Sequence, residues 1–172
     1  MYEILDKMSQ PSRKHSAGNG TMRHSAAPRL APRPLTAPMV VVFSADRELT
    51  GLVEAAVQSP WKVEHCEDPG IGREALARPN IRLVILDDAA VQEEARGWLL
   101  DRIRRLVPQA LLIYVANAHS AAEERRARAY AAQFYTAKPL DRDRIQRVIQ
   151  SFARAATARD SEIAQAKPRH AH

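Results

Sequence analysis

Five short apolar segments alternate with five segments of helical periodicity between residues 39 and 156. The apolar runs, such as "MVVVF" and "IRLVIL", are rich in β-branched residues, as strands buried on both faces of a sheet are. The intervening segments repeat their apolar residues every three or four positions, as amphipathic helices do. Strands joined by helices run parallel, because each helix carries the chain back along the sheet. The sequence therefore predicts an α/β fold, a doubly wound five-stranded parallel sheet with helices on both faces.

The periodicity also gives bounds for the expected elements. Strands are predicted at 39–43, 61–65, 81–86, 110–116 and 133–136. Helices are predicted at 47–58, 71–77, 91–107, 120–132 and 141–156. Asp46 stands where an N-cap belongs. Trp98 and Leu106 fall on the apolar side of the third helix, so both are expected in the core.

The first 38 residues differ in composition from the rest of the chain. They contain six Lys/Arg against two Asp/Glu, five of the 11 prolines, and no period of 3.6 or 2. Such a segment buries too little apolar area to offset the entropy lost on ordering. We therefore predict a disordered, basic, proline-rich arm at 1–38, one folded domain at 39–156 and a flexible tail at 157–172.

Composition and missing motifs exclude several classes of protein. No apolar run approaches the roughly 18 residues of a membrane-spanning helix, and no signal peptide is apparent, so a cytoplasmic location and no membrane partner are expected. A single cysteine, Cys66, excludes an intramolecular disulfide. Neither GxGxxG nor a P-loop follows the first strand, where a nucleotide site would need one. The sequence favours a protein that is not an enzyme.

The net charge of +6 raises the question of nucleic-acid binding. The excess lies mainly in the arm, because residues 39–155 hold 17 Lys/Arg against 16 Asp/Glu. Aromatic residues that could stack on bases make up only 5% of the chain. Nucleic-acid binding through the basic arm therefore stays a third-ranked alternative, electrostatic and sensitive to salt.

Polar and charged residues follow four of the predicted strands. In a parallel sheet such residues meet at one rim, formed by the carboxyl ends of the strands. The rim residues expected here are Ser44, Ala45, Asp46, Asp87, Asp88, Ala116, Asn117, Lys138 and Pro139. This placement lets the Lys138 ammonium reach an anion near Asp87, and Pro139 fixes the turn that directs it.

Four segments, "VVVFSADREL", "LVILDDAA", "LLIYVAN" and "FYTAKPLDRDRI", resemble the receiver domain of bacterial two-component response regulators, which is CheY-like in fold. The resemblance covers residues 39–155. It implies that Asp87 is the acceptor of phosphate from a histidine kinase and that Lys138 contacts the phosphoryl oxygens. It also implies that Pro139 follows a cis peptide bond and that Tyr135 is the aromatic residue of the family's switch.

The chain departs from the family pattern at positions that matter for phosphorylation. The acidic pair that holds Mg²⁺ is replaced by Ser44 and Ala45, which leaves Asp87 with Asp46 or Asp88 as the carboxylates for a metal. The hydroxyl that ends the fourth strand in the family is replaced by Ala116.

Two readings fit these departures. In the first, the chain is an atypical single-domain response regulator, or pseudo-receiver, whose phosphorylation is weak or lost and which acts through a protein partner, either a histidine kinase or a downstream effector. In the second, it is a working phosphoacceptor in a phosphorelay. The first is favoured, because losing the metal's carboxylates should cost several kcal/mol of transition-state stabilisation.

The resemblance also indicates a contact face. Receiver domains often form dimers through the fourth helix, fifth strand and fifth helix, here 120–132, 133–136 and 141–156. A homodimer through this face is one expectation. Tyr130 and Tyr135 would be its aromatic contacts.

Overall fold

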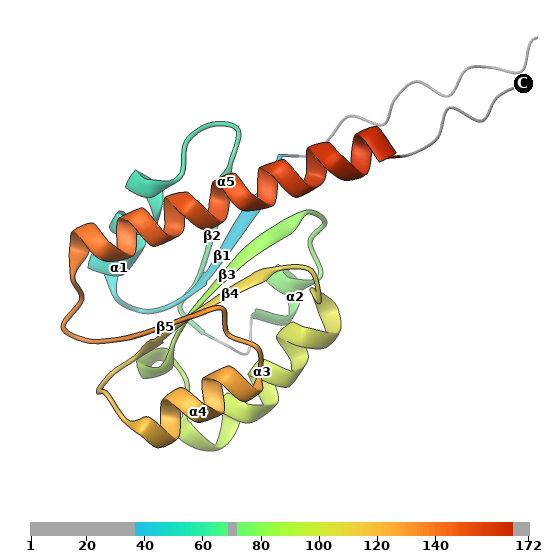
Figure 1. Cartoon of the computed structure of the whole chain (residues 1–172). Helices are drawn as coiled ribbons and strands as arrows, with labels where there is room; N and C mark the ends of the chain where they lie inside the picture. The colour runs from blue at the N-terminus through green and yellow to red at the C-terminus, as the bar shows by residue number, and fades with distance from the viewer. Residues whose placement is uncertain (1–36, 69–71, 167–172) are drawn as a thin grey trace, which may run out of the picture. The chain divides into compact units, whose positions relative to one another are not determined.

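A computed structural model describes residues 37–68 and 72–166, without the side chains of Arg73 and of residues 161–166. Its five strands are β1 (Met39–Phe43), β2 (Lys62–Cys66), β3 (Ile81–Asp87), β4 (Leu111–Ala116) and β5 (Phe134–Ala137). Its helices are α1 (Arg47–Ala56), α2 (Gly72–Leu76), α3 (Glu93–Leu106), α4 (Ala121–Ala129) and α5 (Arg142–Ala166), with a 3₁₀ turn η1 (Asp88–Ala90) after β3. Figure 1 shows their arrangement.

All strands pair in parallel, in the order β2-β1-β3-β4-β5. Along the sequence, β1 is the first strand of the sheet and β2 pairs on one side of it. The strands β3, β4 and β5 then follow on the other side of β1. The side on which new strands are added to the sheet therefore changes between β1 and β3. Open α/β sheets bind ligands at such a point, beyond the carboxyl ends of the strands. The predicted fold class is confirmed.

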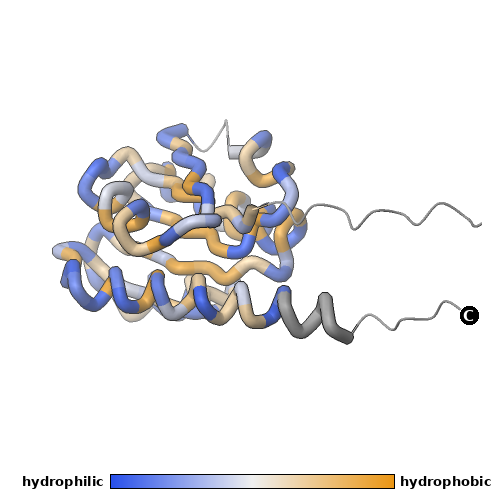
Figure 2. Tube along the Cα trace, turned by 90° about the horizontal axis from the view of Figure 1, so that it is seen from above, coloured by the Kyte–Doolittle hydropathy of each residue, from blue (hydrophilic) through white to orange (hydrophobic). Residues whose placement is uncertain are grey.

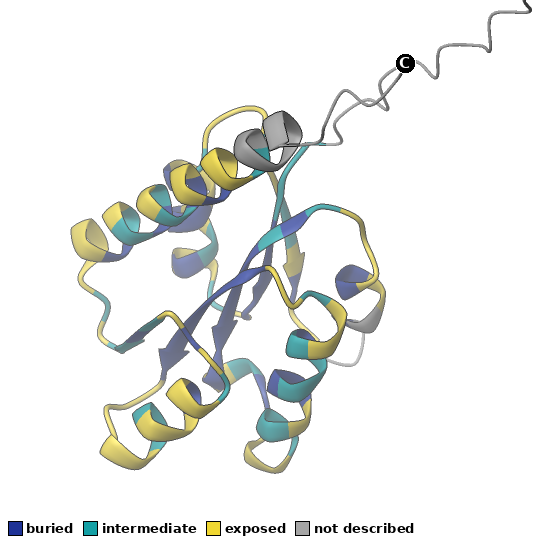
Figure 3. Cartoon of the chain, turned by 45° about the vertical axis from the view of Figure 1, so that its right-hand side comes forward, coloured by how far each residue is buried: buried dark blue, intermediate teal, exposed yellow. Residues whose placement is uncertain are grey.

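The sheet separates two apolar layers, and Figure 3 shows its strands buried between helices whose outer sides are exposed. Leu49 of α1 and Ile149 of α5 pack on one face with strand residues such as Val42. Leu76 of α2, Ile103 of α3 and Ala127 of α4 belong to the layer on the other face. Figure 2 shows that apolar and polar residues alternate along the helices. None of the described helices is both long and apolar enough to cross a membrane.

Two sequence-based expectations about the helices were wrong. The last helix was predicted to end at residue 156, whereas α5 continues to Ala166. Asp160 in this extension pairs with Arg82 on β3, with 2.8 Å between Arg82 Nε and Asp160 Oδ2. This contact lies between residues 78 positions apart, so no local pattern signals it. Residues 1–36 and 167–172, on which the disordered arm and the end of the flexible tail were predicted, lie outside the described residues.

The outward side of α3 was also misjudged. Trp98 is 55% exposed and Leu106 is 45% exposed. The stripe that α3 buries is Leu99, Leu100 and Ile103. Because successive helix residues are rotated by about 100°, Trp98 lies on the far side of the helix from this stripe. The apolar residues of this segment are spread around the helix, so periodicity alone placed the buried face wrongly.

Candidate functional site

The rim of the sheet brings Asp87 together with Ser44 and Lys138. Asp87 is the last residue of β3 and only 1% exposed. Its Oδ2 accepts hydrogen bonds from Ser44 Oγ at 2.7 Å and from Lys138 Nζ at 2.9 Å. Its Oδ1 accepts from the backbone N–H of Ala89 at 3.1 Å. Both oxygens of this buried carboxylate therefore have protein donors.

Asp46 joins the same cluster from the start of α1. Its Oδ1 accepts from the N–H groups of Glu48 and Leu49, so the expected N-cap role is confirmed. Its Oδ2 lies 3.0 Å from Lys138 Nζ. Ser44 Oγ in turn accepts from the Asp46 N–H at 2.9 Å. Ser44, Asp87, Lys138 and Asp46 thus form one connected polar cluster, called the rim cluster below.

Electrostatics favours the charged forms of two members of the rim cluster. Burial lowers the pKa of Lys138, but its hydrogen bonds to Asp87 and Asp46 outweigh burial, and the net pKa is raised. The pKa of Asp46 is lowered, chiefly by the hydrogen bond from Lys138. At neutral pH the Lys138 ammonium therefore sits beside an ionised Asp46.

Asp88 lies outside the rim cluster. Its Oδ1 accepts from the backbone N–H of Asn117 at 2.6 Å, and its Oδ2 lies 3.8 Å from Arg96 Nη1. Burial raises the pKa of Asp88. The η1 turn begins at Asp88 and directs its side chain toward the end of β4. The Asp88 side chain therefore contacts α3 and the residue that follows β4, while the Asp87 side chain contacts the residues that follow β1 and β5.

In the observed arrangement the donors at the rim offer few free ligands to a Mg²⁺ ion. This ion takes oxygen ligands in a near-octahedral arrangement, usually with one or two carboxylates. Here Asp87 Oδ2 and Asp46 Oδ2 both face the Lys138 ammonium, and Ala45 has no ligand atom. Within residues 37–68 and 72–166, no three His, Cys, Asp or Glu side chains form a metal-binding group. The ammonium supplies the positive charge next to Asp87.

Tyr135 and Ala116 lie beside the rim on neighbouring strands. Tyr135 is 8% exposed, and its ring stacks on that of Tyr114 with centroids 5.9 Å apart. Its hydroxyl accepts a long hydrogen bond, 3.5 Å, from the N–H of Ser120. Ala116 is fully buried, and its carbonyl accepts from the N–H of Lys138. The Tyr135 ring is therefore held inward, against β4, without a hydroxyl at position 116.

A buried network next to Tyr135 was missed by sequence reasoning. Tyr114 Oη donates to Glu123 Oε1 at 2.6 Å, and Arg96 Nη1 lies 3.7 Å from the same oxygen. Burial, together with the bond to Glu123, raises the pKa of Tyr114 well above its usual value. A tyrosine inside the apolar run "LLIYVA" was the available signal, because a buried hydroxyl needs a partner.

The remaining predicted site residues occupy two turns. Lys138 and Pro139 are joined by a cis peptide bond, as the family resemblance implies. Tyr130 is the C-cap of α4 and is partly buried, and its carbonyl accepts from Arg104 Nε at 2.7 Å.

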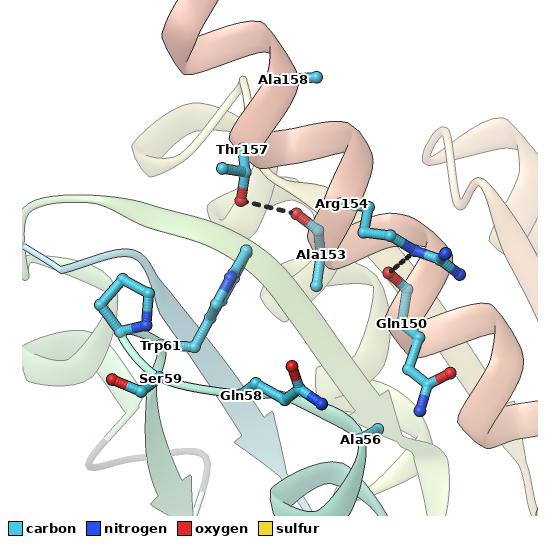
Figure 4. A pocket seen from close by; sticks show the side chains of 10 residues that line it. Ala56, Gln58, Ser59, Trp61, Gln150, Ala153, Arg154, Thr157 and Ala158 are labelled. Carbon is cyan, nitrogen blue, oxygen red and sulfur yellow. Dashed lines mark hydrogen bonds between the residues drawn. The ribbon is translucent and has the colours of Figure 1, made fainter.

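A groove of about 640 Å³ lies away from the rim, between α5 and the loop that leads from α1 to β2. Figure 4 shows Trp61, Gln58 and Gln150 around it, with Arg154 Nε donating to the carbonyl of Gln150. No member of the rim cluster lines this groove. The groove is therefore separate from the candidate site.

Comparison with known proteins gives structural matches only. No family model matches the sequence, and no curated protein matches it. A response regulator receiver domain protein from Methanospirillum hungatei JF-1 superposes with a TM-score of 0.60 at 15% identity, over 72% of this chain and 98% of that one. A response regulator from Thermotoga maritima gives 0.59 at 20% identity, over 69% and 98%.

A third match is a response regulator protein from Burkholderia pseudomallei, solved with a phosphorylated aspartic acid, a calcium ion and citrate. It has a TM-score of 0.55 and 17% identity, over 77% of this chain and 75% of that one. At such low identities a match speaks for the architecture, and the rim chemistry must be judged from this chain's own residues. These likenesses show that the chain has the fold of CheY-like response regulator receiver domains.

Proposed function

We propose that this chain is an atypical receiver protein of bacterial two-component signalling. Phosphorylation of Asp87 is weak or lost, and the protein acts by contact with another protein, a histidine kinase or a downstream effector. The observation that carries this proposal is the occupied carboxylate of Asp87, which is buried and bonded to Ser44, Lys138 and the amide of Ala89. An incoming phosphoryl group would have to displace at least one of these donors.

The charges of the rim cluster support the same proposal. Phosphoryl transfer depends on cations that neutralise the charge of the transferring group. Among the described residues, the ammonium at this rim is that of Lys138, which is already shared by Asp46 and Asp87, at 3.0 and 2.9 Å. Ser44 can donate one hydrogen bond but supplies no charge for holding a divalent ion. Little positive charge is left for an incoming phosphoryl group.

The partner is proposed to bind the face formed by α4, β5 and α5. Tyr135 is mostly buried and cannot be a large exposed contact there, whereas Tyr130 is half-buried. Exposed arginines dominate the helices of this face: Arg125, Arg126, Arg128, Arg142 and Arg144. A partner with an acidic surface fits this charge best, because complementary charges favour encounter and set orientation.

A second candidate is a working phosphoacceptor, and the position of Asp46 favours it. Its Oδ2 reaches the same ammonium as Asp87, so the two carboxylates flank one rim position. If Lys138 swung toward a phosphoryl group, both carboxylates would become available to a cation. This candidate requires the rim cluster to rearrange, while the first does not.

The experiment that separates the two is a titration of the isotope-labelled full chain with Mg²⁺ and beryllofluoride, a mimic of a phosphoryl group on aspartate, followed by amide NMR. We expect no saturable shifts near Asp87, Lys138 and Tyr135. The matched variant carries both Ser44→Asp and Ala45→Asp, which restore the two carboxylates. We expect this variant to gain a saturable response that a further Asp87→Asn change removes.

A saturable response of the unmodified chain that is lost in Asp87→Asn would overturn the proposal. It would establish the phosphoacceptor instead. Incubation with acetyl phosphate and intact-mass measurement give a second readout, in which the unmodified chain should gain no phosphoryl group.

A further inference from the structure

The exposed side of α3 carries two large apolar side chains that belong neither to the rim nor to the α4, β5 and α5 face. Trp98 and Leu106 are the exposed large hydrophobic side chains of the described residues, and both lie on this helix. Single exposed apolar residues are common, but two on one side of one helix indicate a contact surface. Trp98, Asp101, Arg102, Arg105 and Leu106 are called the α3 surface below.

The spacing within the α3 surface is symmetric. Trp98 lies four positions before Arg102, and Leu106 lies four positions after it, about 6 Å along the helix in each direction. The guanidinium of Arg102 lies over the Trp98 ring, 5.2 Å from its centroid. Among the described residues, Arg102 Nε is buried and has no hydrogen-bond partner. Because Nε is buried, a partner from outside the chain could reach only the rest of the guanidinium, which lies on the Trp98 side of α3.

We infer that the α3 surface binds the same surface of a second copy of this chain, with the two helices antiparallel and a two-fold axis at Arg102. In such an isologous contact, residue i meets residue j and j meets i. The two-fold rotation about Arg102 places Trp98 opposite Leu106 of the second copy. Each exposed apolar side chain then covers one on the other copy, which removes both from water.

Charges on the α3 surface fit the same arrangement. Asp101 bonds Arg105 within its own helix at 2.5 Å. In the antiparallel pair, Asp101 lies about 1.5 Å along the axis from Arg102 of the second copy and about 3 Å from its Arg105. Asp101 therefore provides an acceptor for the guanidinium groups of Arg102 and Arg105 of the second copy. The two Arg102 side chains face each other at the axis, and the two Asp101 carboxylates beside them offset their charges.

The α3 contact accounts for exposed apolar area that the alternative dimer face lacks. None of the exposed large hydrophobic residues of the described chain lies on α4, β5 or α5. Pairing through α3 leaves that face free for the proposed partner. A contact of one 14-residue helix with its copy is small, so the dimer should be weak and dependent on concentration.

The first test is sedimentation velocity on the full chain over about a hundredfold range of concentration. We expect a reversible monomer–dimer equilibrium that Trp98→Ala weakens by about tenfold or more, with a smaller effect of Leu106→Ala. Because both side chains are exposed in the monomer, circular dichroism and melting temperature should stay nearly unchanged.

A charge exchange tests the antiparallel register. Asp101→Arg alone and Arg105→Asp alone should each abolish the homodimer, because they place like charges together. Mixed in equal amounts, the two variants should form a heterodimer, in which each Arg again meets an Asp of the other chain. Native mass spectrometry distinguishes the two possible homodimers and the heterodimer by mass.

The matched control is the same exchange at Glu124 and Arg128 of α4, which also pair four positions apart on an exposed helix. These changes should leave the dimer intact. A chain that stays monomeric throughout, or a dimer lost in the α4 variants and kept in the α3 variants, overturns the inference. The test does not involve Asp87, so its outcome is independent of whether the chain is phosphorylated.

Discussion

At the rim, the ammonium of Lys138 pairs with two carboxylates. Lys138 Nζ lies within 3.0 Å of an oxygen of Asp46 and of Asp87. If either carboxylate is removed, the ammonium still has a partner. If the ammonium is removed, Asp87 stays buried with only neutral donors, Ser44 and the Ala89 amide. The stability of the rim cluster therefore depends more on Lys138 than on either carboxylate.

This inequality gives a first prediction about stability. Lys138→Met should lower the free energy of unfolding by about 3 kcal/mol, because it leaves a buried carboxylate without its counter-charge. Asp87→Asn should cost only about 1 kcal/mol, since Lys138 keeps Asp46 and the side chain keeps its volume. Urea denaturation at neutral pH measures both. Equal losses in the two variants would contradict the shared-ammonium description.

The raised pKa of Lys138 gives a second prediction, about pH. A lysine whose pKa is higher in the folded state stabilises the fold fully below its ordinary value of 10.5. That contribution is lost as the pH rises through the folded-state pKa. The difference in unfolding free energy between the unmodified chain and Lys138→Met should therefore be constant from neutral pH to about pH 9 and shrink above about pH 10.5.

A matched lysine controls for general effects of alkaline solution. Lys62 has an exposed side chain, and Lys62→Met should change the unfolding free energy little at any pH. If the difference for Lys138→Met did not shrink at high pH, the Lys138 charge would not be what stabilises the rim.

Among the helices, two glycines with different surroundings give a third prediction. A Cβ at Gly72, the first residue of α2, would overlap Cε1 of the buried Phe43 ring. Gly72→Ala should therefore destabilise the chain by about 1 to 3 kcal/mol, since the ring must move within a packed core. A Cβ at Gly51, inside α1, meets nothing within 4 Å.

Gly51→Ala is the control for that helix substitution. Alanine has a higher helix propensity than glycine, so this change should raise the unfolding free energy by about 0.5 to 1 kcal/mol. Thermal melts of both variants test the pair. A stabilising Gly72→Ala would show that α2 can move away from Phe43 at little cost.

A partly buried hydrogen bond joins Tyr114 of β4 to Glu123 of α4, which gives a fourth prediction. Tyr114→Phe removes the donor to Glu123 and should cost about 1 to 3 kcal/mol, because the carboxylate loses a partner in a partly buried site. Hydrogen exchange should increase in 121–129 more than in α1. Tyr130→Phe, at a partly buried position, is the control and should leave exchange in α4 unchanged.

Over the whole molecule, the two apolar layers around the sheet are built from residues of the described domain, with α1 and α5 on one face and α2, α3 and α4 on the other. A fifth prediction follows for the domain division. Deleting residues 1–36 should leave the melting temperature within about 2 °C of that of the full chain, because the core is retained. A larger fall would mean that the first 36 residues contribute to the stability of the fold.

Much of the architecture could be predicted from local pattern. The strands were placed within one residue of their observed ends, because apolar β-branched runs mark them. Asp46 was identified as an N-cap from its position alone, and its second contact, with Lys138, could not be, because the two residues are 92 positions apart. Ser44 was interpreted as a loss of charge, and its donation to Asp87 became visible only when β1 and β3 were paired.

The sequence by itself determined the order of strands and helices, the parallel sheet and the edge at which Asp87 and Lys138 meet. These follow from periodicity, and from the geometric rule that parallel strands end at one rim. Only the tertiary structure decided which side of α3 faces water, how far α5 extends, and that Lys138 is shared by two carboxylates. Each of these depends on distances between residues far apart in the chain, and a hydrogen bond or a buried face has no energy until both of its partners are in place.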